Sequence, residues 1–253
     1  MRILSLQYPT LDGAPFIGAF QSSLSDPIAW SERGLDQRQI ERILRGDWYT
    51  RCKRVVDTVI AAVLLILLLP LLLVIAVAVK LSSPGPVLYL QPRIGRYGQP
   101  FDMLKFRTMG PDRRHHNAGP PDGTQERRRY HKTRQAGRDP RVTRVGRMLR
   151  RTSLDELPQL WNVLIGEMSL IGPRPEMPYL VAGYQSWQHA RHLVRPGITG
   201  WWQVNRSDGW LEGVLMHEAT DLDLYYVRRQ SLWLDLQIVL RTFGAVVRGS
   251  GAY

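Results

Sequence analysis

Residues 59–79 form an unbroken run of 21 apolar residues, VIAAVLLILLLPLLLVIAVAV. As a helix this run would extend about 31 Å, close to the roughly 30 Å thickness of the hydrocarbon core of a bilayer. A uniformly apolar run of this length is rare in soluble domains, so it predicts a membrane helix rather than a buried core helix. About fifty residues precede the run and no small-residue cleavage site follows it, which argues against a signal peptide.

Two features of the run argue against a simple crossing. Pro70 lies at its middle, where it removes a backbone hydrogen bond and would cost about 3 kcal/mol in a straight helix. Basic residues flank the run on both sides: Arg51, Lys53 and Arg54 before it, Lys80, Arg93 and Arg96 after it. Because positive charge favours the cytoplasmic face, we expect a helix that breaks at Pro70 and leaves by the leaflet it entered. A single-pass anchor kinked at Pro70 is the alternative.

Positive charge is the second strong feature of the chain. Lys and Arg number 34 against 22 Asp and Glu, and residues 107–151 alone hold 14 basic and 4 acidic side chains. Such a segment could bind nucleic acid, anionic lipid headgroups or a phosphorylated substrate. Aromatic residues are not interleaved with this charge and no recognition-helix pattern appears, so we expect no nucleic-acid partner. The single cysteine, Cys52, excludes a disulfide framework and a CxxC-type metal site.

The remaining elements are expected from periodicity and breakers. Residues 1–50 form an N-terminal extension, partly helical around 35–44. Residues 87–94 and 100–109 flank the glycine-containing GRYGQ, which predicts a β-hairpin. Residues 110–140 are rich in Pro, Gly, His and Arg, and we expect a mobile basic loop. The stretch 231–247 predicts a helix with one apolar face, packed in the core or lying along the membrane surface: Leu232, Leu236, Val239, Leu240, Phe243, Val246 and Val247.

The chemistry is concentrated in residues 152–176, TSLDELPQLWNVLIGEMSLIGPRPE, because the common nucleotide, hydrolase and zinc-protease motifs are absent. The spacing of Leu157, Leu160, Trp161 and Leu164 predicts a helix with Asp155 and Glu156 in its first turn. On spacing alone, a capping box formed by Ser153 and Glu156 is favoured over catalysis. Three nearby arginines offer planar donors suited to a phosphate: Arg150, Arg151 and Arg174.

Several motifs in consistent order resemble one family. These are KRVVD before the apolar run, KFRTM, DPRVTRVGRMLRRTSLDELPQLWNVLIGEMSLIGPRPE, RPGITGWWQVN and DLDLYYVRR. Together they resemble the bacterial sugar transferases and, more narrowly, the monotopic polyprenyl-phosphate phosphoglycosyl transferases. The resemblance extends from about Arg51 to the C-terminus, and it favours catalysis over capping for the acidic pair.

The resemblance implies transfer of sugar 1-phosphate from a UDP-sugar to polyprenyl phosphate, with release of UMP. It makes Asp155 the nucleophile and Glu156 its assistant, both beside Mg²⁺. It places Pro70 at the membrane hinge, where Leu69-Pro70 replaces the family's Ser-Pro pair. It also implies a bacterial inner membrane protein with its catalytic domain on the cytoplasmic face, and it leaves a homodimer open. The matched positions that would bind phosphate or substrate are Lys105, Arg150, Arg174, Arg195 and Asp223.

The expected architecture is therefore α+β, with a membrane helix over 51–81 and a cytosolic domain over 82–253. That domain would combine helices, a small β-hairpin and amphipathic helices at the membrane interface. Two alternatives remain from the residues themselves. A membrane-anchored polybasic adaptor would have no activity, and a lipid-phosphate hydrolase would release inorganic phosphate rather than UMP.

Overall fold

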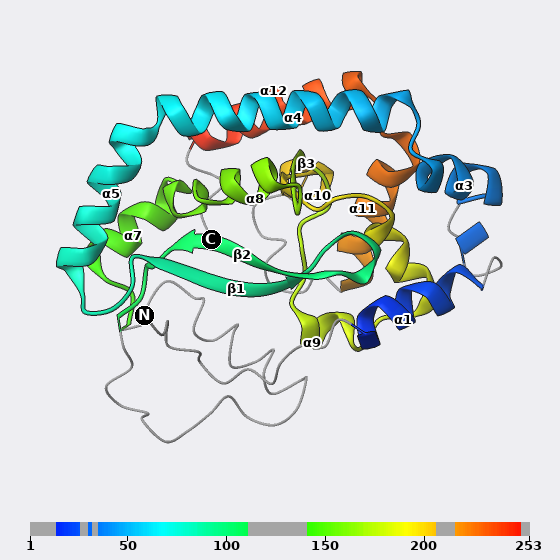
Figure 1. Ribbon diagram of the computed structural model, residues 1–253, viewed down its shortest axis with the longest axis horizontal. Helices are drawn as coiled ribbons and strands as arrows, with labels where there is room; N and C mark the ends of the chain where they lie inside the picture. The colour runs from blue at the N-terminus through cyan, green and yellow to red at the C-terminus, as the bar shows by residue number, and fades with distance from the viewer. Residues whose placement is uncertain (1–13, 26–29, 32–34, 111–140, 206–215, 249–253) are drawn as a thin grey trace.

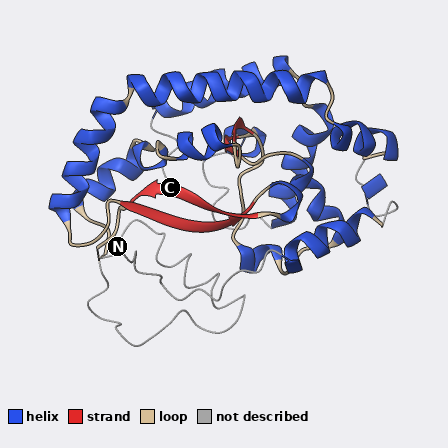
Figure 2. Ribbon diagram, in the orientation of Figure 1, coloured by secondary structure: helices blue, strands red, loops and turns tan. Residues whose placement is uncertain are grey.

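The computed structural model describes residues 14–25, 30–31, 35–110, 141–205 and 216–248, and Figures 1 and 2 show a mostly helical molecule with two small sheets. The α-helices are α1 (Ala14–Leu24), α3 (Gln37–Arg45), α4 (Trp48–Leu67), α5 (Leu69–Ser82), α7 (Arg144–Arg151), α8 (Gln159–Ile165), α9 (Pro178–Val181), α10 (Trp201–Asn205), α11 (Met216–Arg229) and α12 (Leu232–Arg248). Three 3₁₀ helices are η1 (Arg96–Gly98), η2 (Leu154–Glu156) and η3 (Ser186–Leu193). The strands are β1 (Leu88–Ile94), β2 (Pro100–Phe106), β3 (Ser169–Ile171) and β4 (Gly197–Thr199).

The apolar run lies in the helices α4 and α5, which meet at Leu68 with a bend of 64°. Pro70 lies in the first turn of α5, where an α-helix does not need the missing N–H. Within the described ranges no single helix is long and apolar enough to cross a bilayer, whereas this bent pair qualifies by length and composition. The break predicted at Pro70 is confirmed.

Both ends of the bent pair are attached to the same folded domain. At the start of α4, Arg54 donates a hydrogen bond to the Leu164 carbonyl of α8 at 3.0 Å. At the end of α5, Arg107 donates to the carbonyls of Val79 (3.2 Å) and Ser83 (2.6 Å). Between these attachments the pair exposes apolar side chains, among them Val59, Val63, Ile66, Leu67, Leu73, Val74 and Val77.

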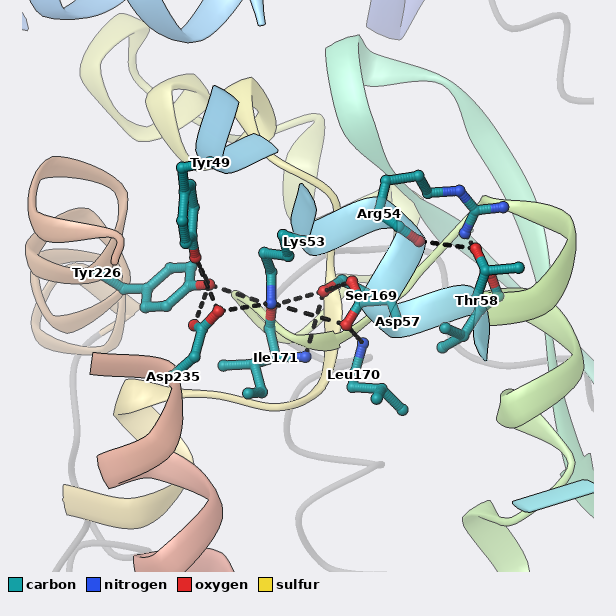
Figure 3. Close-up of polar contacts among 11 residues, drawn as sticks. Tyr49, Lys53, Arg54, Asp57, Thr58, Ser169, Leu170, Ile171, Tyr226 and Asp235 are labelled. Atoms are coloured by element: carbon teal, nitrogen blue, oxygen red, sulfur yellow. Dashed lines mark hydrogen bonds and ion pairs between the residues drawn. The ribbon is translucent and has the colours of Figure 1, made fainter. Parts of the chain in front are cut away.

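A buried polar network, shown in Figure 3, joins α4 to β3, α11 and α12. The Lys53 ammonium lies 2.9 Å from an Asp235 oxygen and 3.8 Å from an Asp57 oxygen. Ser169 donates to Asp57 at 2.6 Å. Asp235 also accepts two phenolic hydrogen bonds, each 2.8 Å long, from Tyr49 and Tyr226. The network gives three buried charges partners and thereby fixes the start of α4.

Strands β1 and β2 pair antiparallel, which confirms the predicted hairpin. The Asn162 side chain of α8 binds the backbone of β2, donating to the Asp102 carbonyl at 2.9 Å and accepting from the Leu104 amide at 3.0 Å. A side chain that both donates to and accepts from one strand fixes the position of that strand along α8. Lys105, the next residue of β2, is thereby held in place.

A second sheet, of two parallel strands, was not expected from the sequence. It pairs Ser169 of β3 with Gly197 of β4. The strands approach so closely that a Cβ at Gly197 would lie 2.1 Å from the Gly172 nitrogen, so only glycine fits there. Residue 172 leads directly into the turn Pro173–Pro175, and the sheet therefore sets the position of that turn.

The N-terminal helices take part in a core shared with later elements. Buried residues of this cluster come from both parts of the chain: Phe20, Trp30, Leu35 and Ile43 pack with Trp187, Ala190, Leu193, Leu224 and Val227. The helix expected around 35–44 is confirmed as α3.

Helix α12 places its predicted apolar face outward. Its buried face is formed by Leu234, 6% exposed, and Ile238, 0% exposed. Five members of the predicted stripe are instead 46–72% exposed: Leu232, Leu236, Val239, Leu240 and Phe243. Core packing of this stripe is therefore wrong, because α10 and α11 pack against the adjacent face, which carries Leu234 and Ile238. Its position along a membrane surface stays a prediction, and the side chains of Val246 and Val247 lie outside those the structure describes.

The two residues that border the segment 111–140, Gly110 and Arg141, lie next to each other. The Gly110 amide donates to the Arg141 carbonyl at 2.9 Å, and Met109 forms an antiparallel bridge with Val142. Residues 111–140 lie outside the described part of the chain, and so does the predicted mobile loop.

Candidate active site

The acidic pair lies in the short turn η2, separate from the helix α8 that follows it. Ser153, which precedes the turn, has a left-handed backbone (φ 55°) and makes no capping hydrogen bond. The predicted capping box is therefore wrong, and so is the placement of Asp155 and Glu156 in the first turn of a longer helix. The physical reason is that Glu156 has charged partners elsewhere in the chain, which bind a carboxylate more strongly than a backbone amide does.

Glu156 is held by two cations from different elements. Its Oε1 atom lies 2.8 Å from the Lys105 ammonium of β2 and 2.8 Å from the Arg174 guanidinium. Burial alone would raise the pKa of Glu156, but Arg174 and Lys105 outweigh burial and hold it well below its usual range. Burial lowers the pKa of the Lys105 ammonium, and Glu156 opposes that effect. Glu156 is thus a fixed negative charge between two positive ones.

Asp155 has a different environment from its neighbour. It is 9% exposed, and among the described residues it forms no ion pair within 4 Å. Burial raises the pKa of its carboxyl, against the opposing fields of Lys105 and Arg150. Two adjacent carboxylates whose pKa values move in opposite directions are typical of a pair with different catalytic roles.

Arg150 reaches this cluster from the last turn of α7. Its Nε donates to the Thr108 hydroxyl at 2.9 Å, and its charge lowers the pKa of Asp155. The structure therefore brings together five of the predicted site residues: Asp155, Glu156, Lys105, Arg150 and Arg174. They come from β2, α7, η2 and the turn after β3.

The turn that carries Arg174 is held from behind by two buried arginines. Arg93 of β1 donates to the Pro175 carbonyl at 3.0 Å. Arg191 of η3 donates to the Arg174 carbonyl at 2.6 Å. The expectation that Arg93 is a basic residue at the membrane flank is wrong, because its side chain is only 6% exposed and binds inside the domain. No local spacing marks either residue as a support of this turn, since both partners lie far along the chain.

Asp223 and Arg195 lie elsewhere. Asp223 forms an ion pair with Arg191 at 2.6 Å and is 2% exposed. Burial raises the pKa of Asp223 to about 7, against the opposing charge of Arg191. Arg195 donates to the Gly166 carbonyl at the end of α8 at 2.9 Å and lines a pocket at the start of α4. Among the described residues, Asp223 is linked to the acidic pair through Arg191, which donates to the Arg174 carbonyl.

The donor set fits a divalent metal that takes most of its ligands from a substrate. No group of three or more His, Cys, Asp and Glu side chains could hold a metal within the described ranges. Mg²⁺ commonly binds through one or two carboxylates plus phosphate oxygens and water. Asp155 and Glu156 supply such a pair, and Lys105, Arg150 and Arg174 supply donors for phosphate oxygens.

Comparison with known proteins gives a consistent result. The sequence model of the family described as "Bacterial sugar transferase" matches residues 48–249. An "Undecaprenyl-phosphate glucose phosphotransferase" of Komagataeibacter xylinus is 43% identical over 85% of this chain and 39% of its own length. Two proteins called "UDP-glucose:undecaprenyl-phosphate glucose-1-phosphate transferase" also match. That of Caulobacter vibrioides is 47% identical over 79% of this chain and 72% of its own length. That of Escherichia coli is 43% identical over 75% of this chain and 39% of its own length.

Proposed function

The chain belongs to the bacterial sugar transferase family, and we propose that it transfers sugar 1-phosphate from a UDP-sugar to undecaprenyl phosphate, releasing UMP. The relatives named for this reaction support the proposal, although the chain spans only 39% of the length of two of them. The observation that carries it is the convergence of Lys105, Arg150 and Arg174 on the Asp155–Glu156 pair. Such an arrangement suits a reaction between anions.

The proposed chemistry has two steps. First, a carboxylate oxygen of Asp155 attacks the phosphorus that carries the sugar, and the bond from this phosphorus to the bridging oxygen breaks. UMP leaves with that oxygen, and the sugar phosphate remains as an acyl phosphate on Asp155. Second, an oxygen of undecaprenyl phosphate attacks the same phosphorus and the bond to Asp155 breaks. The carboxylate is regenerated, and the product is a lipid-linked pyrophosphoryl sugar.

The residues around Asp155 have distinct roles in this scheme. Arg174 and Lys105 neutralise the incoming pyrophosphate, and Arg150 supplies a further planar donor. Glu156 fixes the positions of Lys105 and Arg174 through its Oε1 atom. Asp155 and Glu156 would hold Mg²⁺, which would add positive charge against the phosphate oxygens.

The membrane topology is part of the proposal. Both ends of the α4–α5 pair are attached to the domain that contains Asp155, through Arg54 at one end and Arg107 at the other. A helix that crossed a bilayer would separate its ends by about 30 Å of hydrocarbon. We therefore favour re-entry, with the apolar bend in one leaflet and the catalytic domain on the cytoplasmic face. A soluble nucleotide sugar and a lipid phosphate would then meet at headgroup level.

The decisive variant is Asp155→Asn, which keeps the shape and hydrogen bonding of the side chain but removes the attacking charge. Turnover should fall by roughly 10⁴-fold or more while thermal unfolding is unchanged. Asp102→Asn is the matched control, because Asp102 is exposed on β2 and should keep full activity. An active Asp155→Asn enzyme would refute the assignment of the nucleophile.

The covalent step can be measured without the lipid. Wild-type protein given UDP-sugar and Mg²⁺ should release a burst of about one UMP per active site. Mass spectrometry of the quenched protein should find sugar phosphate on the peptide containing Asp155, and none in the Asn variant. When undecaprenyl phosphate is added in a second sample, release of inorganic phosphate rather than UMP would favour a lipid-phosphate hydrolase, and absence of any release would favour a polybasic adaptor. A panel of UDP-sugars in this assay would identify the sugar.

A further inference from the structure

A second cluster of arginines, separate from those at Asp155, surrounds a pocket at the start of α4. Arg54 comes from α4, Arg96 from η1 and Arg195 from the segment before β4. The rest of the lining is mixed: polar groups such as Thr50 and Gln230, the Lys53–Asp57 pair, and the apolar side chains of Ile43, Ile171 and Val194. Three arginines from three segments thus line one small space.

Each arginine is fixed by a backbone carbonyl rather than by a carboxylate. Arg54 donates to Leu164 at 3.0 Å, Arg96 to Leu193 at 3.1 Å, and Arg195 to Gly166 at 2.9 Å. Arg96 is further oriented by the Tyr97 ring, whose centre lies 4.4 Å from the guanidinium carbon. The carbonyls position the arginines but carry no net charge.

Within the described residues the positive charge of this pocket is balanced only in part, by Asp57 and by the carbonyls at the C-terminal end of α8. None of Arg54, Arg96 and Arg195 has an Asp or Glu within 4 Å there. The acid that lines the pocket, Asp57, is already bound to Lys53 and Ser169. The pKa of the Arg195 guanidinium is lowered by burial and further by the like charges of Arg96 and Arg54. Like charges brought together in a half-buried site are stabilised by a bound anion.

We propose that this pocket binds a phosphate group, supplied by the headgroup of an anionic membrane phospholipid. Guanidinium forks that converge and are already oriented match the geometry of phosphate oxygens. The inference rests on the membrane insertion proposed above, but not on the transfer reaction.

The depth of the pocket favours a lipid as the source of the phosphate. Arg54 precedes the first residue of the apolar run, Val59, by five positions, or about 7 Å along a helix. The headgroup layer on each side of a bilayer is roughly 5–8 Å thick. With the apolar run in hydrocarbon, Arg54 and the pocket around it lie at the level of lipid phosphates.

Native mass spectrometry of the full chain in detergent tests the proposal. Phosphatidylglycerol and phosphatidylcholine are added in separate samples, and inorganic phosphate is added as a competitor. Wild-type protein should retain one phosphatidylglycerol in preference to phosphatidylcholine. Arg96→Gln should lower that retention about tenfold, the effect of losing one charged hydrogen-bonded contact. Arg96→Lys, which keeps the charge without the fork, should retain an intermediate amount.

Arg45→Gln is the matched control, because the Arg45 side chain is 82% exposed on α3 and the charge change is the same. It should bind lipid as wild type does. Unchanged lipid retention in Arg96→Gln would overturn the proposal that this pocket binds the lipid phosphate. If inorganic phosphate binds and no lipid is retained, the proposal that a phospholipid headgroup supplies the bound phosphate would be overturned. Retained lipid in a protein that releases no UMP would refute the transfer reaction and leave the pocket supported.

Discussion

Replacing Lys53 by methionine removes the ammonium group that lies between Asp57 and Asp235 in Figure 3. Its ammonium lies 2.9 Å from Asp235 and 3.8 Å from Asp57, so the two carboxylates lie within about 7 Å of each other. Without Lys53 they repel each other by about 2 kcal/mol at an effective dielectric constant near 20. Both also lose a partner while they stay buried, with side-chain exposures of 6% for Asp57 and 9% for Asp235.

Removing one member of a buried ion pair typically costs about 3–5 kcal/mol, and we expect this range for Lys53→Met. For a chain of this size the loss corresponds to a decrease in Tm of about 6–20 °C. Thermal unfolding in detergent, followed by tryptophan fluorescence, measures it. Lys80→Met is the control, because Lys80 is exposed at the end of α5 and its replacement should cost less than about 0.5 kcal/mol.

The double variant Lys53→Met with Asp235→Asn tests whether Lys53→Met destabilises the protein through repulsion between the two carboxylates or through lost packing of the Lys53 side chain. Asparagine removes one of the two stranded carboxylates and leaves an oxygen that can accept from the tyrosines. The double variant should therefore be more stable than Lys53→Met alone, by about 1–3 kcal/mol. If the two substitutions simply add, or if Lys53→Met unfolds at the temperature of Lys80→Met, the electrostatic account of this network is wrong.

Three further outcomes follow from the structure. Because α1 shares a buried core with the catalytic domain, Ser22→Cys in a Cys52→Ser background should be protected from a membrane-impermeant thiol reagent in intact cells, and Pro70→Leu should not expose it; labelling of Ser22→Cys would contradict re-entry. Because burial raises the pKa of Asp155, UMP release should be lost as pH falls through a pKa above the ordinary carboxyl value of about 4, and an acidic limb at or below that value would contradict it. Asp223→Asn leaves Arg191 with the longer ion pair to Glu176, at 3.6 Å, and should cost about 3 kcal/mol in thermal unfolding while raising KM for the UDP-sugar; an unchanged KM would refute its role behind the turn.

The parts of the fold that depend on local pattern could be predicted. An apolar run with Pro70 at its centre can only be helical and broken, and the structure places the bend at Leu68. The strands around GRYGQ form the predicted hairpin because their ends are joined by a short glycine-containing turn. The grouping of Arg150 and Arg174 with Asp155 and Glu156 came from their closeness in the sequence, whereas their catalytic roles came from motif resemblance.

The parts that depend on distant partners could not be predicted. Ser153 and Glu156 fit a capping box locally, but Lys105 and Arg174 bind Glu156 from elsewhere in the chain. Periodicity identified the apolar stripe of α12 but not which way it faces, because that depends on where neighbouring helices pack. Strands β3 and β4 have three residues each, too few for an alternating pattern to be recognised.

The hydrogen bond between Gly110 and Arg141 holds the two ends of the segment 111–140 together, so the length of that segment does not affect the geometry of the site. Because these ends are joined by backbone hydrogen bonds, residues added to or removed from 111–140 do not change the distance that the segment must bridge. Loop closure costs only about 0.6 kcal/mol for each doubling of length. The chain can accordingly be divided into two fragments that meet where Gly110 is hydrogen-bonded to Arg141. One contributes Lys105 and the other the Asp155–Glu156 pair, so recovery of activity from separately expressed fragments would report directly on their assembly.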